Sequence, residues 1–117
     1  MILVDTSVWI DHFRRALPPL QDALANGVVG THPFVVGELA LGQLRHRSLT
    51  LRWLARLPQV PVATQADVLH VVEQHALVGT GLGWVDAHLL CAARLADWRL
   101  WSRDRAVVRG ATRLGLD

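Results

Sequence analysis

The sequence has no lysine, a single cysteine and no long hydrophobic run. The single cysteine, Cys91, cannot form a disulfide within the chain and fits a reducing compartment. No apolar stretch approaches the roughly 20 residues that a membrane-spanning helix needs. The N-terminus also lacks the basic start of a signal peptide, and Asp5 interrupts its apolar run. We therefore expect a cytoplasmic protein that does not associate with a membrane.

The sequence also lacks the ligand pairs that are typical of zinc sites. It contains no Cys-x-x-Cys pair and no His-x-x-x-His pair, and His70 and His75 are separated by five positions. A zinc enzyme is therefore disfavoured.

All twelve basic residues are arginine, the net charge is +2 and the isoelectric point is about 9.9. The planar, two-pronged donor set of arginine binds phosphate well, so this balance permits a nucleic-acid ligand. A compositional bias that exchanges lysine for arginine explains the same balance. Composition alone does not decide between these two interpretations.

Length and patterning predict one domain over residues 1–117, because 51% of the chain is hydrophobic and no repeat or linker interrupts it. Short apolar runs predict strands over residues 2–5, 28–31, 60–63 and 99–102, with a last edge strand at 114–116. Helical spacing and capping signals predict helices over residues 6–13, 18–26, 32–44, 49–57, 64–78, 84–96 and 104–110. This alternation predicts an α/β fold with a short, mostly parallel central sheet between helical layers.

Four acids occupy informative positions in this pattern. Asp5 closes the first strand, Asp104 follows the late strand, Asp86 lies in the first turn of a helix, and Glu38 lies in an apolar helical stretch. Acids that follow parallel strands converge at the carboxyl edge of the sheet. Two ionised carboxylates about 4 Å apart repel by roughly 4 kcal/mol at an effective dielectric of 20, so four require a cation or a bound proton. Hard oxygen ligands select Mg²⁺ or Mn²⁺, and phosphodiester hydrolysis is the chemistry that such a site predicts.

Each of these acids also has a simpler explanation when it is taken alone. Asp5 and Asp104 are suited to cap the helices that follow them, and Asp86 is suited to stabilise a helix N-terminus through the helix dipole. This alternative does not account for Glu38. It also does not explain why several acids fall at ends that share one edge of the sheet.

Four segments resemble the PIN-domain family and, more narrowly, the VapC toxins of bacterial toxin–antitoxin pairs: Val4–Asp11, Gly37–Leu39, Gly83–Leu90 and Leu100–Asp104. The resemblance covers almost the whole chain and implies a PIN-like three-layer α/β/α fold. It implies an endoribonuclease that depends on Mg²⁺, with Mn²⁺ as a substitute, cleaves structured RNA and inhibits translation. It also implies a homodimer that a VapB-like antitoxin holds inactive in a hetero-oligomer.

The resemblance also assigns expected roles to individual residues. The acidic positions of the family correspond to Asp5, Glu38, Asp86 and Asp104, which would be the catalytic metal ligands, and its hydroxyl positions correspond to Thr6 and Ser102. The arginines expected to contact RNA phosphates are Arg14, Arg15, Arg45, Arg47, Arg103 and Arg105. The residues expected to line a groove for the antitoxin are Trp9, Phe13, Leu41, Leu44, Leu49 and Leu54.

Two rival functions stay open at the level of the sequence. One is a catalytically silent PIN-like module that binds a partner through its apolar helices. The other is a phosphotransferase that forms a phospho-aspartate at Asp5. Such enzymes place a second aspartate two residues later, where this chain has Ser7, and the chain has no lysine to steady the phosphate.

Overall fold

The structure is a computed structural model that describes residues 1–117. Three parallel strands and seven helices alternate along the chain, which confirms the predicted α/β fold. In chain order the elements are β1 (Ile2–Val4), α1 (Thr6–Arg14), α2 (Pro18–Ala25), β2 (Val29–Gly30), α3 (Pro33–Leu41), α4 (Arg47–Arg56), α5 (Gln65–Gln74), α6 (Trp84–Ala96), β3 (Arg99–Trp101) and α7 (Arg105–Leu114).

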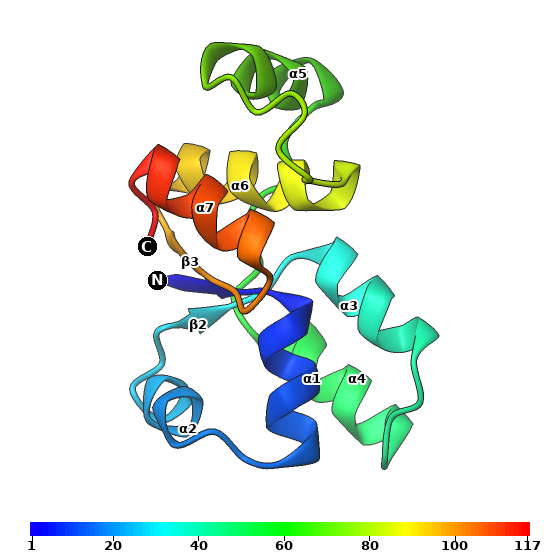
Figure 1. Cartoon of the computed structure of the whole chain (residues 1–117). Helices are drawn as coiled ribbons and strands as arrows, with labels where there is room; N and C mark the ends of the chain where they lie inside the picture. Colours follow the sequence, from blue (N-terminus) through cyan, green and yellow to red (C-terminus); the bar gives the residue numbers. More distant parts are fainter.

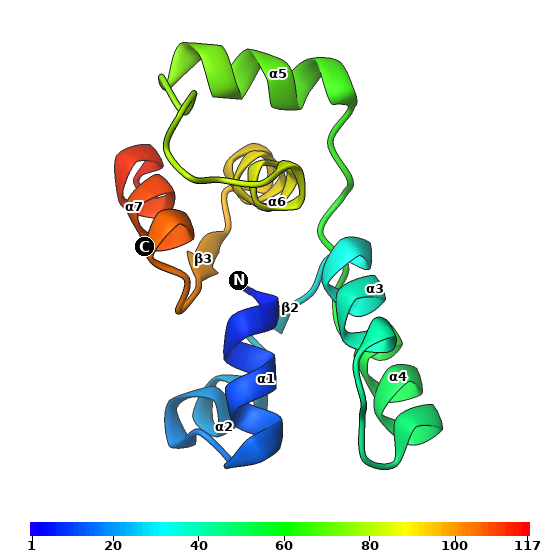
Figure 2. The ribbon, with the colours of Figure 1, turned by 45° about the vertical axis from the view of Figure 1, so that its right-hand side comes forward.

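The sheet has the strand order β2-β1-β3, with β1 in the centre. In its register Leu3 pairs with Gly30 on one side and with Leu100 on the other. The sheet lies between α6 and α7 on one side and α1 and α2 on the other (Figure 1). Figure 2 shows α3 and α4 beside α1, and α5 on the outer side of α6. Because all three strands are parallel, the residues that follow β1 and β3 leave the sheet at the same edge.

Helix α6 contributes more buried residues to the core than any other element, and β1 passes through its centre. Leu3, Val4, Leu89 and Leu90 have no exposed surface, and Cys91 is a buried free thiol. The helix predicted for residues 84–96 has the same bounds in the structure. Its apolar residues repeat at helical spacing, Gly83 precedes it, and Asp97 ends it in the left-handed conformation.

Several predicted elements differ in the structure for local reasons. The strand predicted at residues 114–116 is wrong, because Leu114 ends α7 and Gly115 takes a φ of 72°. Residues 60–63 form no strand, and the only pairing nearby is the bridge between Thr31 and Gln59. Pro61 lies within that segment and Pro58 precedes it, and a proline has no N–H to donate to a strand. The helices predicted for 32–44 and 64–78 end earlier, at Leu41 and Gln74.

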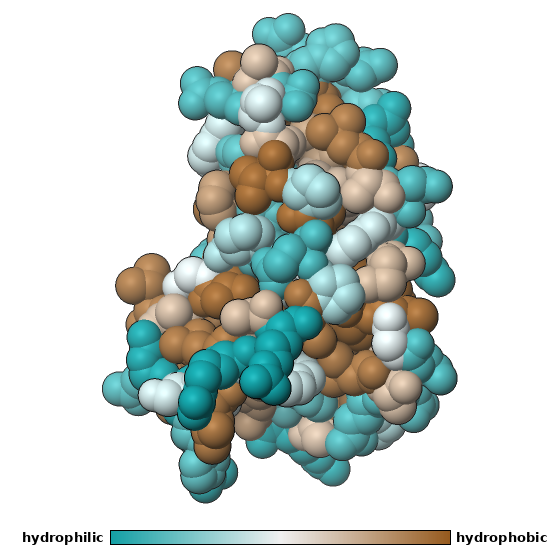
Figure 3. Space-filling view, turned by 180° about the vertical axis from the view of Figure 1, so that it is seen from behind, coloured by the Kyte–Doolittle hydropathy of each residue, from teal (hydrophilic) through white to brown (hydrophobic).

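The surface carries apolar side chains in several places. Seen from behind, hydrophobic areas are interrupted by hydrophilic ones (Figure 3). Large exposed residues include Leu41, Leu49 and Trp53 on α3 and α4, and Leu69 on α5. The helices are all too short or too polar to cross a lipid bilayer.

Candidate active site

Asp5 is a buried carboxylate that does not cap a helix. It is 5% exposed and occupies the N-cap position of α1, yet its side chain makes no capping hydrogen bond. Instead its Oδ2 accepts hydrogen bonds from Ser102 Oγ at 2.6 Å and from Ser7 Oγ at 2.9 Å. Both hydroxyl groups donate to Oδ2, so the other carboxylate oxygen, Oδ1, accepts no hydrogen bond from the protein. The capping explanation therefore fails for this acid.

Ser7 is a site residue that the sequence reasoning missed. Its Oγ lies 3.3 Å from Ser102 Oγ and accepts the backbone N–H of Arg103 at 3.0 Å. Ser102 Oγ accepts the backbone N–H of Asp104 at 3.0 Å. The two hydroxyls therefore tie the turn after β3 to the first turn of α1 and fix Asp5 between them. The only signal in the sequence was a second hydroxyl two positions after the acid.

Asp104 is an exposed residue at the N-cap of α7, and its Oδ1 accepts the backbone N–H groups of Ala106 at 2.9 Å and Val107 at 3.2 Å. The capping explanation therefore holds for one of its oxygens. The other oxygen, Oδ2, has no protein donor.

Asp86 is a half-buried carboxylate in the first turn of α6. Burial raises its pKa above the ordinary value, the hydrogen bond from the Gly83 N–H opposes that rise, and the charges of Asp5 and Asp104 raise the pKa further. The repulsion from both acids means that the three carboxylates influence one another across the carboxyl edge of the sheet. A cation placed among them would remove this repulsion and favour the ionised form of Asp86.

Glu38 lies on the exposed side of α3, so burial does not force it to have a partner. Its Oε1 nevertheless accepts a hydrogen bond from Thr6 Oγ1 at 2.8 Å. Thr6 follows Asp5 directly, so this bond brings the fourth acid to the start of α1. Together Asp5, Glu38, Asp86 and Asp104 are called the acidic cluster below.

The donor chemistry of the acidic cluster fits a hard divalent cation. Asp5 and Asp104 each keep one oxygen without a protein donor, and carboxylate oxygens are the ligands that Mg²⁺ and Mn²⁺ prefer. As the side chains lie, however, no three His, Cys, Asp or Glu residues are arranged to hold a metal ion. Binding would therefore require rotation of these side chains toward a shared point, which is least restricted for the exposed Glu38 and Asp104.

A groove of about 610 Å³ begins at Glu38 and runs between α1 and the connection from α3 to α4. Phe13 and Leu44, two of the six residues expected to line an antitoxin groove, lie on its wall. Leu41 and Leu49 are exposed but lie outside it. Trp9 and Leu54 have no exposed surface, so their expected place in the groove is corrected to the core. The Trp9 ring is covered by Trp53 of α4, with the ring centroids 5.7 Å apart.

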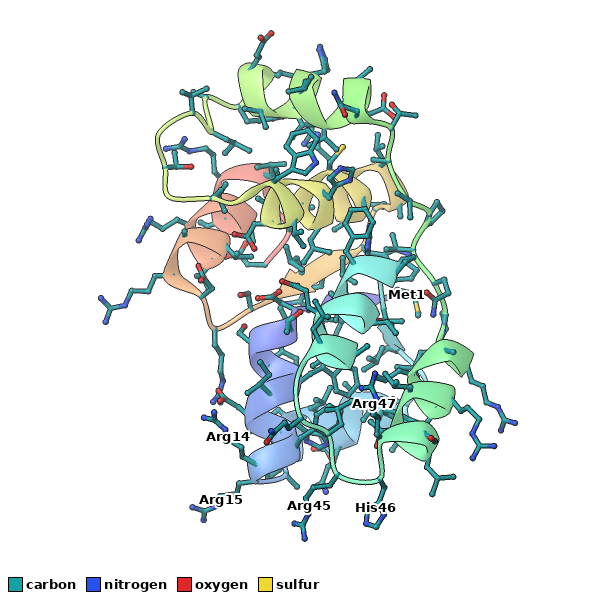
Figure 4. All side chains as sticks on the ribbon, turned by 90° about the vertical axis from the view of Figure 1, so that its right-hand side faces the viewer. Met1, Arg14, Arg15, Arg45, His46 and Arg47 are labelled. Carbon is teal, nitrogen blue, oxygen red and sulfur yellow. The ribbon has the colours of Figure 1, made fainter.

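Four of the six arginines expected to contact RNA lie at the end of the molecule where α1 stops and α3 connects to α4. Figure 4 labels this basic group, which includes a histidine: Arg14, Arg15, Arg45, His46 and Arg47. Arg14 and Arg45 also line the groove that contains Glu38. Arg47 has a structural contact, because its Nη1 donates to the carbonyl of Ala40 near the C-terminus of α3 at 2.7 Å. Arg103 and Arg105 lie apart, on either side of Asp104.

The stability of the fold is expected to fall when the solution becomes acidic, because of His32. This residue is buried at the N-cap of α3, where its Nδ1 accepts the Phe34 N–H at 2.9 Å. Burial, and then the charge of His88, lower the pKa of His32 from 6.5 to about 4. Below pH 6.5 the unfolded chain therefore binds a proton at His32 that the folded chain does not bind. The free energy of unfolding that is present above pH 6.5 is lost as the pH falls toward 4. The loss is up to about 3 kcal/mol.

Urea unfolding at neutral and acidic pH measures this loss. Asparagine caps helices well and does not titrate in this range, so His32→Asn is the matched control. The account is contradicted if the wild-type protein and His32→Asn lose the same free energy of unfolding on acidification.

The chain is similar to known proteins over almost its whole length. The family model described as "PIN domain" matches residues 2–112. Ribonuclease VapC32 of Mycobacterium tuberculosis, from the strains CDC 1551 and H37Rv, is 45% identical over 117 residues. The alignment covers 99% of this chain and 94% of the relative. The matched range therefore spans the positions of all four acids and all three strands.

Proposed function

This chain belongs to the PIN-domain family, within its VapC-type group, and from this premise we propose that it is a metal-dependent endoribonuclease. It acts as the toxin of a VapBC-type toxin–antitoxin pair, cleaves structured RNA in the cytoplasm and so inhibits translation. The relative named Ribonuclease VapC32 supports the activity. We also assign residues 1–117 to one catalytic domain.

The geometry of Asp5 is the observation that carries this proposal. Asp5 is a buried carboxylate that has neither a basic partner within ion-pair distance nor a capping role. Two hydroxyls hold one of its oxygens and leave the other free. Such an arrangement suits a residue whose second oxygen binds a cation. It does not suit a purely structural acid.

Asp5, Glu38, Asp86 and Asp104 would hold Mg²⁺, or Mn²⁺ in its place. When bound, the ion supplies positive charge that activates water and stabilises the leaving oxygen of the phosphodiester. Ser7 and Ser102 keep Asp5 in a single orientation, and the hydrogen bond from Thr6 brings Glu38 to the start of α1. Burial, and then the charges of Asp5 and Asp104, raise the pKa of Asp86, and a bound cation would favour its ionised form.

RNA contacts are proposed for the arginines of the basic group and for the two arginines beside Asp104. Arg14, Arg15 and Arg45 have no carboxylate partner within ion-pair distance, so they are free to bind phosphates. Arg105 and Arg103 flank Asp104 and would act closest to the chemistry. Arg47 would contribute charge while it keeps its contact with α3.

A VapB-like antitoxin is the proposed protein partner, and the groove beside Glu38 is its proposed site. The groove combines an apolar wall at Phe13 and Leu44 with the charges of Arg14 and Arg45. This combination fits an amphipathic segment that carries acidic side chains. Leu41 and Leu49 extend the apolar surface beside it. We propose a homodimer as the free form of the toxin and a hetero-oligomer as the inhibited form.

Chelation is expected to stop RNA cleavage. Purified protein, freed of any partner, is mixed with cellular RNA in Mg²⁺ and in excess chelator, and the new RNA ends are counted. Cleavage in Mg²⁺ that chelator abolishes and added Mn²⁺ restores would support the proposal. Cleavage at an equal rate in chelator would contradict a metal-dependent mechanism, and no cleavage under either condition would favour the silent binding module.

A further inference from the structure

The structure contains one ion pair between side chains, and it lies beside the acidic cluster. Arg103 Nη1 is 2.8 Å from Asp11 Oδ2. The other eleven of the twelve arginines have no carboxylate within ion-pair distance. Asp11 is therefore unusual in this chain, and its partner is the arginine between Ser102 and Asp104.

Both ends of this ion pair are connected to the residues that hold Asp5. The backbone N–H of Arg103 donates to Ser7 Oγ, which itself donates to Asp5 Oδ2. Ser7 and Asp11 are four residues apart on α1, so they lie on the same face of that helix. The face of α1 that fixes the backbone of Arg103 therefore also fixes its guanidinium group.

The ion pair is well suited to positioning and poorly suited to stabilisation. The two side chains are 50% and 36% exposed, and exposed ion pairs contribute little to folding. A guanidinium group has five N–H donors in a planar fork. Only Nη1 of Arg103 has a protein acceptor, so most of the fork remains free at the rim of the acidic cluster.

Charge near the site explains why such an arginine needs to be held. Arg103 lies next to Asp104 in sequence and close to Asp5 through Ser7. A mobile guanidinium group would be attracted to these carboxylates and would occupy oxygens that a cation needs. The carboxylate of Asp11 lies outside the acidic cluster and binds the guanidinium group of Arg103 in place of those carboxylates.

We propose that Asp11 is a positioning residue that holds Arg103 at the rim of the acidic cluster, with the free edge of its guanidinium group available to a phosphate in a single-stranded loop of the structured RNA. This inference rests on the proposed ribonuclease function and assigns one contact of its substrate. The phosphate bound by Arg103 flanks the one that is cleaved.

The sign of the effect of Asp11→Ala on RNA binding tests this proposal. Removing a negative charge from a protein that binds RNA strengthens binding on general electrostatic grounds. Positioning predicts the opposite, because the arginine loses its orientation. Binding of a fluorescein-labelled RNA stem-loop is measured in chelator, where cleavage does not interfere. We expect Asp11→Ala to weaken binding about threefold to tenfold, and Arg103→Ala to weaken it about tenfold or more.

Further measurements separate positioning from a general loss of charge or of fold. Arg103→Ala is expected to reduce the salt dependence of binding by about 0.7, the value for one phosphate contact to a single strand. In the Arg103→Ala background, Asp11→Ala should no longer weaken binding, and Asp11→Asn, which still accepts a hydrogen bond, should retain most of the wild-type affinity. Asp22→Ala removes the same charge from an exposed site on α2 and is the matched control, while thermal melting checks that each variant is folded.

The outcomes distinguish this inference from the proposed function. If the wild-type protein binds no RNA even at low salt, the proposed function fails and the positioning role fails with it. If the wild-type protein binds RNA but Asp11→Ala binds equally well or more tightly, only the positioning role is overturned. Equal losses for Asp11→Ala in the presence and absence of Arg103 overturn it as well.

Discussion

Replacing Asp5 with asparagine is expected to lower RNA cleavage by about a thousandfold or more. Asp5 is the most buried acid of the cluster, and one of its oxygens has no protein donor. Asparagine removes the negative charge that would attract the cation and so removes several kcal/mol of stabilisation from the transition state. Initial rates of RNA cleavage in Mg²⁺ measure the effect.

The fold is expected to survive this substitution, which makes the result interpretable. The side-chain oxygen of asparagine can still accept the hydrogen bonds of Ser7 and Ser102, and the side chain has nearly the same volume. Calorimetry with Mn²⁺ is an independent measurement and should show weaker binding. Asp22→Asn on α2 is the matched control, because it removes the same charge from an exposed position. A rate for Asp5→Asn within about threefold of the wild-type rate would show that the central assignment is wrong.

Replacing Gly30 with alanine is expected to cost about 3 kcal/mol or more of folding free energy, because it overpacks the sheet. A Cβ at this position in β2 would overlap the ring of Trp98 and would lie 2.9 Å from the carbonyl oxygen of Pro58. The indole ring of Trp98 can shift only if its own packing changes. The carbonyl oxygen of Pro58 already accepts the Thr31 N–H at 2.8 Å, so it cannot move without weakening that hydrogen bond. The added methyl group therefore forces strand β2 and its neighbours apart.

Gly37→Ala provides the matched control for this stability prediction. Gly37 lies in α3, and a Cβ there would have no neighbour within 4 Å. Alanine in a helix is more stable than glycine, so this variant should gain about 0.5–1 kcal/mol. Urea unfolding at neutral pH measures both variants. Similar free energies of unfolding for the two would contradict the close packing at Gly30.

The sequence predicted those parts of the fold whose signals are local. The helix at residues 84–96 has helical spacing throughout, a glycine before it and an exposed end, so its bounds could be read from the residues alone. The placement of Asp5 and Ser102 at one edge of the sheet followed from the rule for parallel strands, and the structure joins them by a hydrogen bond of 2.6 Å. Local patterns also gave Asp104 a capping role, which one of its oxygens fulfils.

The sequence could not predict features that depend on which elements pack together. Trp9 and Leu54 were expected in a groove because helical spacing identifies an apolar face but not what covers it. In the structure Trp53 of α4 lies against the Trp9 ring, and both Trp9 and Leu54 are part of the core. Ser7 was not predicted as a hydrogen-bond donor to Asp5, because a hydroxyl in the first turn of a helix normally indicates capping. Its role depends on the position of the turn after β3, far away in the sequence.

Mapping of RNA 5′ ends after brief induction of this protein in cells is the measurement that tests the account most directly. Cells that produce Asp5→Asn at the same level serve as the control, with no antitoxin present in either case. The account predicts new ends in one or a few RNAs that appear with the wild-type protein and are absent with Asp5→Asn. Identical end profiles for the two soluble proteins would contradict the proposed ribonuclease and would favour a PIN-like module that only binds its partners.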